Sequence, residues 1–120
     1  MREKRQQAER RGRKAETAAA WFLRLKGYRI LEERYRSPYG EIDLIAARGH
    51  QIVMVEVKAR QTEALARESV SLRQRGRIEK AALDWLAKNR KMDNPVRFDV
   101  ITIAPGHVPT HIKDAWRPEA

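Results

Sequence analysis

The chain has no cysteine among its 120 residues. This absence excludes disulfide frameworks, thiol nucleophiles and zinc sites with cysteine ligands. Histidine is scarce as well, and His50, His107 and His111 are too scattered along the sequence for us to propose a zinc site. Aromatic residues make up only 7% of the chain and lie mostly at core-like positions. Recognition of single-stranded nucleic acid, in which bases stack on aromatic side chains, is therefore less supported.

Long hydrophobic runs are also missing. The longest strongly apolar stretches lie near residues 52–57 and 100–104, whereas a membrane-spanning helix needs about 20 apolar residues. The N-terminal residues 1–7 are polar and lack the apolar core of a signal peptide. We therefore expect a cytoplasmic protein with no membrane partner.

The length is that of one compact domain. Apolar residues make up 42% of the chain and charged residues 35%, a composition that allows a packed interior and argues against a disordered protein. We expect a single domain over residues 1–120. Within it, residues 1–9 would form a disordered basic N-terminus, and residues 105–120 would form a tail that packs on the core.

Positive charge is in excess and is unevenly distributed. Lys and Arg number 26 against 16 Asp and Glu, a formal net charge of +10. Residues 1–14 and residues 67–91 each carry a net charge of +5, and the remaining residues are neutral. Both basic segments have helical patterns, so two basic helices could flank a polyanionic ligand such as nucleic acid. The alternative is that the chain is rich in arginine for reasons of overall composition. The solvent-exposed faces of its helices would then carry many arginines without binding a polyanion.

Hydrophobic periodicity and turn residues predict an α/β protein. Two segments repeat apolar residues at three- and four-residue steps, as amphipathic helices do, and four others are β-rich runs bounded by turn residues. The predicted order is a helix over 10–26, strands over 28–31, 41–47 and 51–59, a helix over 71–89 and a strand over 97–104. We expect residues 108–116 to add a short edge strand and a turn. This αβββαβ order implies a mixed central sheet flanked by helices.

The two central strands form the best predicted hairpin. A two-residue turn at residues 49–50, with glycine first, favours type II′ geometry. Asp43 then lies opposite Glu56, and Glu41 lies opposite Lys58, all on one face because strand side chains alternate. Three acids and one lysine therefore meet at one end of an otherwise apolar surface.

Two carboxylates directly opposite each other repel unless they are compensated. A divalent cation would compensate Asp43 and Glu56, since Mg²⁺ takes one or two protein carboxylates and completes its shell with water and phosphate oxygens. Lys58 would then orient a metal-bound water or stabilise charge on phosphorus, which fits phosphodiester hydrolysis. The alternative is that the four charged residues are the solvated half of the hairpin, with Glu41 paired to Lys58. A one-residue register slip would also separate the two acids.

Two motifs in this hairpin carry a family resemblance. Residues 40–45 read GEIDLI and residues 55–60 read VEVKAR, and together they resemble the YraN-like family of uncharacterised bacterial proteins. The resemblance extends over about residues 12–104. That family is similar to the PD-(D/E)xK nuclease superfamily, with its restriction-endonuclease-like fold, and most nearly to archaeal Holliday-junction resolvases. The resemblance implies a restriction-endonuclease-like αβββαβ core and nuclease chemistry.

The resemblance also implies roles for single residues. Asp43 matches the metal-binding aspartate, Glu56 the second carboxylate and Lys58 the catalytic lysine. Glu16 matches an acidic residue that many such nucleases place on the first helix as a further metal ligand. The implied cofactor is Mg²⁺ or Mn²⁺. Alternatively, Glu16 is a surface residue near a helix start, where the helix dipole favours a negative charge.

Further residues are candidates for contact with nucleic acid. Guanidinium groups match phosphate oxygens geometrically, and the second basic helix supplies most of the set, which consists of Arg36, Arg60, Arg73, Gln74, Arg75, Arg77 and Lys80. Gln74 resembles a glutamine found near some nuclease sites, but the Ser71–Gln74 spacing is also that of a helix capping box. Arg36 and Arg60 could equally be solvated ion pairs. Asp99, on a core strand, is expected to be a structural partner of Arg97 or of a helix end.

We therefore expect a Mg²⁺-dependent nuclease that acts on DNA, with branched or otherwise structured DNA among its substrates. Phosphate contacts would make binding salt-dependent and largely indifferent to sequence. The alternative is a non-catalytic nucleic-acid-binding or assembly protein that retains the fold. A weaker possibility is an adaptor for an acidic protein. A homodimer would suit a four-way junction, although no sequence feature establishes one.

Overall fold

The computed structural model describes residues 2–59 and 70–118, with side chains from Gly12 onward. Its elements are α1 (Arg2–Leu25), β1 (Arg29–Arg36), β2 (Glu41–Arg48), β3 (Gln51–Lys58), α3 (Leu72–Lys88), β4 (Val96–Thr102) and β5 (Thr110–Trp116). The five strands form one sheet in the order β1-β2-β3-β4-β5. Only the β3–β4 pair is parallel, so the predicted αβββαβ order and mixed sheet are confirmed, with β5 as an added edge strand.

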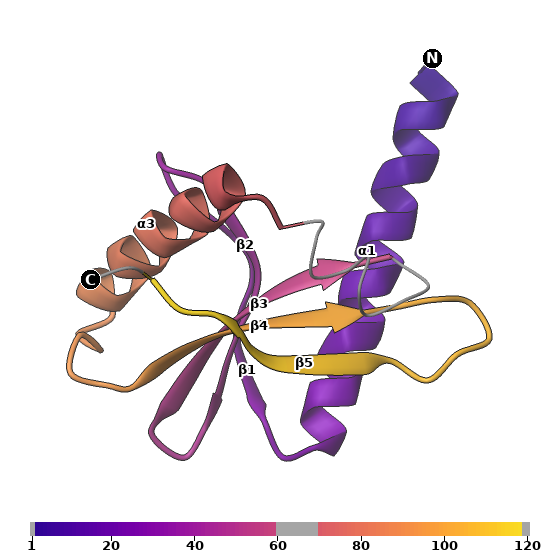
Figure 1. The fold of residues 1–120 in the computed structure, drawn as a ribbon. Helices are drawn as coiled ribbons and strands as arrows, with labels where there is room; N and C mark the ends of the chain where they lie inside the picture. Colours follow the sequence, from indigo (N-terminus) through magenta and orange to yellow (C-terminus); the bar gives the residue numbers. More distant parts are fainter. Residues whose placement is uncertain (1, 60–69, 119–120) are drawn as a thin grey trace.

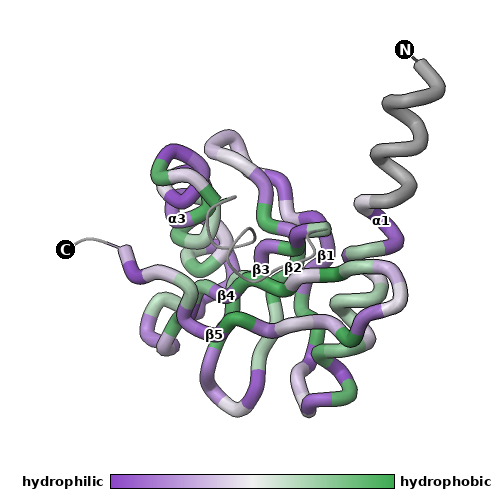
Figure 2. The backbone as a smooth tube through the Cα atoms, turned by 45° about the vertical axis from the view of Figure 1, so that its right-hand side comes forward, coloured by the Kyte–Doolittle hydropathy of each residue, from purple (hydrophilic) through white to green (hydrophobic). Residues whose placement is uncertain are grey.

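The two helices cover opposite faces of the sheet (Figure 1). Ala19, Ala20 and Leu23 of α1 pack with Leu44 of β2 and Val53 of β3. The apolar stripe of α3 packs on the other face against alternate residues of the same strands, and its buried members are Ile78, Ala81, Ala82, Trp85 and Leu86. Hydrophobic residues are concentrated on the central strands β3 and β4 (Figure 2). None of the described helices combines the length and apolar character that a bilayer crossing requires.

Helix α1 begins at Arg2, eight residues before the predicted start, so residues 2–9 belong to the helix. The segment is rich in Arg, Lys, Glu, Gln and Ala, which are good helix formers, and it lacks proline. The other end is a Schellman motif, in which the Tyr28 N–H donates to Leu23 O and the Gly27 N–H donates to Arg24 O. Gly27 has a φ of +91°, which this motif requires.

The predicted hairpin register is confirmed over most of its length. Residues 44–48 pair with residues 55–51, and Gly49 alone of the two turn residues has positive φ, at +61°, as a type II′ turn requires. The ladder stops at Leu44 and Val55, so Asp43 and Glu56 lie just beyond its last pair. Side chains three residues apart on a regular strand point to opposite faces of the sheet. Ile42 and Ile45 nevertheless pack in the same cluster, so the alternation of faces breaks between them, near Asp43.

Strand β1 is twice as long as predicted, because its second half, residues 32–36, is polar and half-exposed and so lacks the apolar pattern of a core strand. Arg34 within it has a φ of +53°, in the left-handed region. At the other edge, β5 pairs antiparallel with β4. Trp116 of β5 stacks on Phe98 of β4, with ring centroids 5.2 Å apart.

Candidate functional site

Four side chains meet where β2 and β3 pass under the first turn of α3. Glu56 and Lys58 come from β3 and Asp43 comes from β2, just beyond the last pair of the β2–β3 ladder. Lys58 Nζ lies 3.4 Å from Glu56 Oε1. Gln74 of α3 donates from Nε2 to the same Glu56 oxygen at 3.2 Å and accepts from Lys58 Nζ at 3.5 Å. The glutamine therefore bridges the acid and the lysine.

Asp43 is held by the backbone of the neighbouring strand. Its Oδ2 accepts a hydrogen bond from the Val57 N–H at 2.8 Å, in the region where the β2–β3 ladder has ended. The end of the ladder frees this N–H for a side chain. The Asp43 carboxylate is thereby fixed beside Glu56, with which it also shares a hydrogen bond.

The two carboxyl groups hold protons more tightly than isolated acids do. Burial is the main cause that raises the pKa of Glu56 to about 8, and the negative charge of Asp43 adds to it, whereas Lys58 opposes it. Burial also raises the pKa of Asp43, against the hydrogen bonds from Val57 and Glu56. Glu56 is only 8% exposed. Ionisation of both Asp43 and Glu56 would place two negative charges side by side in a buried site, which is unfavourable. The two carboxyl groups therefore share one proton.

The acids open into a pocket of about 310 Å³, lined by Gly40, Glu41, Asp43, Glu56, Gln74, Arg77 and Ile78. A Cβ on Gly40 would lie 3.1 Å from Arg77 Cβ, so any other residue there would force the β1–β2 turn or α3 to shift by a few tenths of an ångström. Glu41 is ion-paired with Arg36 at 3.0 Å, not with Lys58 as the alternative interpretation of the hairpin required. Lys58 therefore interacts with Glu56 and Gln74 and not with Glu41.

Glu16 does not join this group. Its Oε2 accepts from Arg34 Nε at 2.6 Å, and burial is the main cause that raises its pKa, against the hydrogen bond from Arg34. The negative charge of Asp43 raises it further, so the two acids do act on each other. Within the described part of the chain, no three Asp, Glu or His side chains are grouped so that they could hold one metal ion. The structure therefore brings together Asp43 and Glu56 and leaves Glu16 beside Arg34.

Asp43 and Glu56 nevertheless present the donor chemistry that a hard divalent cation requires. Carboxylate oxygens are preferred ligands of Mg²⁺ and Mn²⁺, and one or two of them suffice for Mg²⁺ when water and phosphate complete the shell. A cation would also compensate the charge that both acids would carry when ionised. The pair fits such a metal, whereas the Glu16 carboxylate would first have to leave Arg34.

Of the predicted phosphate-binding residues, Gln74 and Arg77 line the pocket, whereas Lys80 lines a different hollow on α3. Arg73, Arg77 and Lys80 of α3 are exposed, and Arg77 lines the pocket. Arg75 turns away from it, because its Nε donates to Val70 O and its guanidinium lies over the Trp116 ring. Arg36 is exposed in its pair with Glu41. Arg60 lies outside the described residues.

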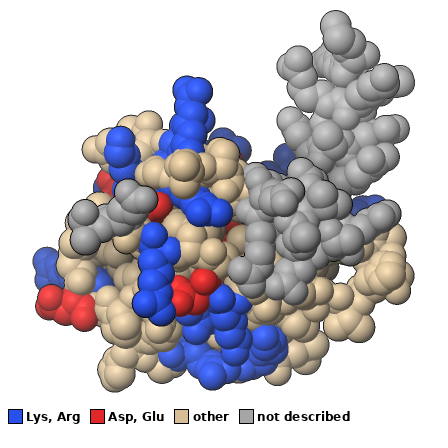
Figure 3. Space-filling view, viewed as in Figure 1, with Lys and Arg blue, Asp and Glu red and all other residues tan. Residues whose placement is uncertain are grey.

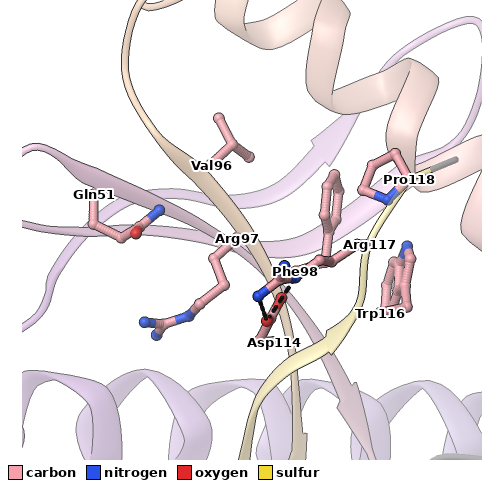
Figure 4. Close-up of a pocket in the computed structure, with 8 residues that line it drawn as sticks. All are labelled: Gln51, Val96, Arg97, Phe98, Asp114, Trp116, Arg117 and Pro118. Carbon is pink, nitrogen blue, oxygen red and sulfur yellow. Dashed lines mark hydrogen bonds and ion pairs between the residues drawn. The ribbon is translucent and has the colours of Figure 1, made fainter. Parts of the chain in front are cut away.

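Another pocket, of about 360 Å³, lies beside β4 and β5 (Figure 4). Its one acid, Asp114, is bonded to Arg117 at 2.8 Å, and the rest of its lining includes Phe98 and Trp116. It has no pair of adjacent carboxylates. We therefore place the candidate site at Asp43 and Glu56.

The sequence predicted two alternatives for Gln74, a glutamine near a nuclease-like site or half of a capping box with Ser71. Only the Ser71 half of the box forms, in which Ser71 Oγ accepts from the Gln74 N–H at 3.1 Å, while the Gln74 amide points to Glu56. Arg34 lies in a polar segment, and nothing in the sequence around it marks it as the partner of Glu16. The predicted partnership of Asp99 with Arg97 is confirmed at 2.8 Å.

Comparison with known proteins identifies relatives over most of the chain. A model described as "Uncharacterised protein family UPF0102" matches residues 15–103. A UPF0102 protein of Maricaulis maris is 48% identical over 115 residues, which cover 95% of this chain and 91% of the relative. UPF0102 proteins of Rhizobium johnstonii and Bartonella quintana are 48% and 49% identical; the alignments cover 93% and 92% of this chain and 93% and 91% of those relatives. The YraN-like resemblance is confirmed, and the chain belongs to the uncharacterised protein family UPF0102.

Proposed function

We propose that the protein is a metal-dependent nuclease that hydrolyses DNA phosphodiesters. The observation that carries the proposal is the buried pair of Asp43 and Glu56 with Lys58 Nζ 3.4 Å from Glu56 Oε1. Acids with raised pKa values beside a lysine, in a pocket, are typical of functional sites. The resemblance to PD-(D/E)xK nucleases supports the same chemistry, since these three residues occupy the positions of its motif. The expected cytoplasmic location agrees with a DNA substrate.

Asp43 and Glu56 would hold Mg²⁺ or Mn²⁺, and the metal would supply a Lewis acid and a water of lowered pKa. Glu16 would join them as a third ligand only after its separation from Arg34. Binding of the cation requires both acids to ionise, so it competes with the shared proton. The hydrogen bond from the Val57 N–H keeps Asp43 in place while this exchange occurs.

Lys58 and Gln74 would complete the site. The Lys58 ammonium can orient the attacking water or stabilise negative charge on the phosphoryl oxygens. Gln74 restricts both partners, because it accepts from Lys58 and donates to Glu56. It would therefore be a positioning residue that keeps the ammonium next to the acids.

DNA would approach across the exposed side of α3. Arg73, Arg77 and Lys80 would contact backbone phosphates, and the position of Arg77 in the pocket lining brings one such contact next to the acids. Phosphate contacts hold a duplex without reading its bases. We therefore propose recognition by DNA shape, with branched or otherwise structured DNA as the substrate class.

A second candidate function is nucleic-acid binding without cleavage, including a role in assembly. It is favoured by one observation, which is that each acid already has a partner within the protein. Glu16 is bonded to Arg34, and Glu56 is bonded to Gln74 and Lys58. Such a network stabilises the fold without any metal.

Incubation with a set of labelled DNA substrates distinguishes the nuclease from a protein that binds nucleic acid without cleaving it. Linear duplex, single-stranded, flap and four-way DNA would be incubated with the full chain in Mg²⁺, Mn²⁺ or chelator. A nuclease produces cleaved strands with either metal and none with chelator. Binding to these substrates with no cleavage in any metal would support the second candidate instead.

A further inference from the structure

A second group of cations lies on the α1 side of the sheet. Lys26 follows the end of α1, Arg48 ends β2 and Lys113 lies on β5. Their charges act on one another: burial is the main cause that lowers the pKa of Lys26, and Lys113 and Arg48 lower it further. Arg48 also lies over the Tyr28 ring, 5.1 Å from its centroid. The Tyr28 ring lies 5.9 Å from the His111 ring, and His111 contacts Lys26 and lies two residues before Lys113 on β5. These contacts bring cations from three parts of the chain to one region.

These cations lack acidic partners. Among the ion pairs between described side chains, none includes Lys26, Arg48 or Lys113. The nearby acid, Asp99, is fully buried and is already bonded to Arg97 and His111. Like charges held together without compensation are unfavourable in the free protein. An anionic ligand would relieve this repulsion.

The Lys26 ammonium is held in place from the interior. Its Nζ lies 2.7 Å from His111 Nδ1, and His111 Nε2 lies 2.6 Å from Asp99 Oδ2. The His111 side chain is 2% exposed and that of Asp99 is 0% exposed. A lysine ammonium has only donors, so His111 accepts at Nδ1 and donates from Nε2 to Asp99. This chain and the Phe22 ring, whose centroid lies 5.1 Å from Nζ, fix the position of the ammonium.

The group is separate from the candidate nuclease site. Arg48 lies five residues after Asp43 along β2, which corresponds to about 17 Å of strand. The Lys26 end of α1 lies on the face of the sheet opposite α3 (Figure 1). In the view of Figure 3, Lys and Arg side chains gather on the lower part of the surface, below the position of β5. Positive charge is therefore not confined to α3.

We propose that Lys26, Arg48 and Lys113 form a second phosphate-binding site, which binds the backbone of a further segment of the DNA held at α3. This inference rests on the proposed function. Because α1 and α3 cover opposite faces, a straight duplex lying along α3 does not also reach the Lys26 group. A second arm of a branched molecule does. Contacts at both faces would give branched DNA a higher affinity than linear duplex.

The test measures binding in chelator, so that it does not depend on cleavage. Fluorescence anisotropy would give the affinity of the full chain for four-way and linear DNA at several salt concentrations. We expect the double variant Lys26→Gln with Lys113→Gln to bind four-way DNA at least tenfold more weakly, with a salt slope reduced by about two. Its affinity for linear duplex should change less than threefold. Equal losses for the two substrates, or no loss for either, would overturn the proposal.

Two controls keep the result interpretable. The double variant Arg90→Gln with Lys91→Gln removes the same charge from the far end of α3, and we expect it to preserve the preference for four-way DNA. The single variant Lys113→Gln is used if the double variant is unstable. It leaves the Lys26–His111 contact intact, so we expect a folded protein with a partial loss of affinity for four-way DNA. Lack of any effect from Lys113→Gln in a folded protein would contradict the site.

Inorganic phosphate distinguishes backbone recognition from binding of a small anion. Phosphate would be titrated into the protein while the His111 ring resonances are followed by NMR. Weak binding that is displaced by four-way DNA supports a backbone site. Saturable phosphate binding that four-way DNA does not displace would assign the site to a free anion and refute the proposal. Metal-dependent cleavage that Asp43→Asn abolishes would still support the nuclease, so the two proposals fail separately.

Discussion

Gln74 Nε2 donates a hydrogen bond to Glu56 Oε1 at 3.2 Å and so joins the first turn of α3 to the third strand of the sheet. The same side chain accepts from Lys58, while the Gln74 backbone N–H is capped by Ser71. One residue thereby links the start of a helix to a buried acid and a lysine. The organisation of the candidate site depends on this contact as well as on the hairpin.

Gln74→Ala should reduce nuclease activity more than it reduces stability. The variant loses both side-chain bonds within the site but retains the helix cap, so we expect a cost of about 1 kcal/mol in the free energy of unfolding and at least a tenfold fall in cleavage rate. Urea unfolding and cleavage assays measure the two effects. Ser71→Ala is the matched control, since it removes a cap worth about 1 kcal/mol and leaves the Gln74 amide in place. Equal activity loss in both variants would assign Gln74 a merely structural role.

Glu56 should make the protein less stable as the pH rises. Its pKa is raised from 4.5 to about 8 in the folded chain, chiefly by burial, so the folded state binds a proton that the unfolded state has released between these values. The free energy of unfolding therefore falls with pH across this window, by up to about 5 kcal/mol when the whole shift is counted. Glu56→Gln should flatten the profile. Urea midpoints measured from pH 5 to pH 9 in chelator test this, and an equally steep profile in the variant would refute it.

Asp99 should have the opposite pH dependence. Burial alone would raise its pKa, but hydrogen bonds from His111, Arg97 and the Asp114 N–H together lower it. Its stabilising contribution is therefore present above the ordinary value of 3.8 and is lost as the pH falls below it. Asp99→Asn should cost about 3 kcal/mol at pH 7, because it breaks a buried ion pair.

Asp114→Asn is the control for this change. Asp114 forms an exposed pair with Arg117, and such pairs contribute less than about 1 kcal/mol. Its φ of +53° is one that asparagine tolerates. Similar melting temperatures for the two variants would contradict the structural role assigned to Asp99.

Metal binding should stabilise the wild-type chain. A ligand of the folded state at ten times its Kd adds about 1.4 kcal/mol, which corresponds to roughly 4 °C in Tm for a domain of this size. Asp43→Asn should abolish the shift with Mg²⁺ or Mn²⁺, because it removes one of the two acids proposed to hold the ion. Scanning calorimetry with and without metal measures it. A shift of the same size in the variant would place the metal elsewhere.

The predictable part of the site is local in the sequence. Alternation of apolar residues and a glycine-first turn predicted the pairing of residues 44–48 with residues 51–55. The break in alternation at Asp43 and the end of the ladder there were not predicted. The family resemblance implied that Glu16 is a metal ligand but did not predict its pairing with Arg34. That pairing depends on how α1 packs beside β1. The Gln74 contact likewise depends on the docking of α3 onto β3, which no short-range pattern specifies.

The fold was predictable to a similar extent. Helix α3 lies within about one residue of its expected bounds, because Ser71 caps it and a regular apolar stripe runs through it. The second half of β1 was not predicted, since edge residues 32–36 are polar and half-exposed and so resemble a loop. Helix α1 begins eight residues before its expected start, because residues 2–9 lack an apolar stripe but have a high helix propensity.

The rate of metal-dependent cleavage of four-way DNA by the wild type and by Asp43→Asn, purified in parallel, tests the central claim most directly. Asp93→Asn, an exposed surface change outside the site, is the control for purification and folding. We predict cleavage by the wild type and Asp93→Asn in Mg²⁺ or Mn²⁺, and a loss of at least a hundredfold in Asp43→Asn. Cleavage at the wild-type rate by Asp43→Asn, or no cleavage by any of the three proteins, would contradict the account.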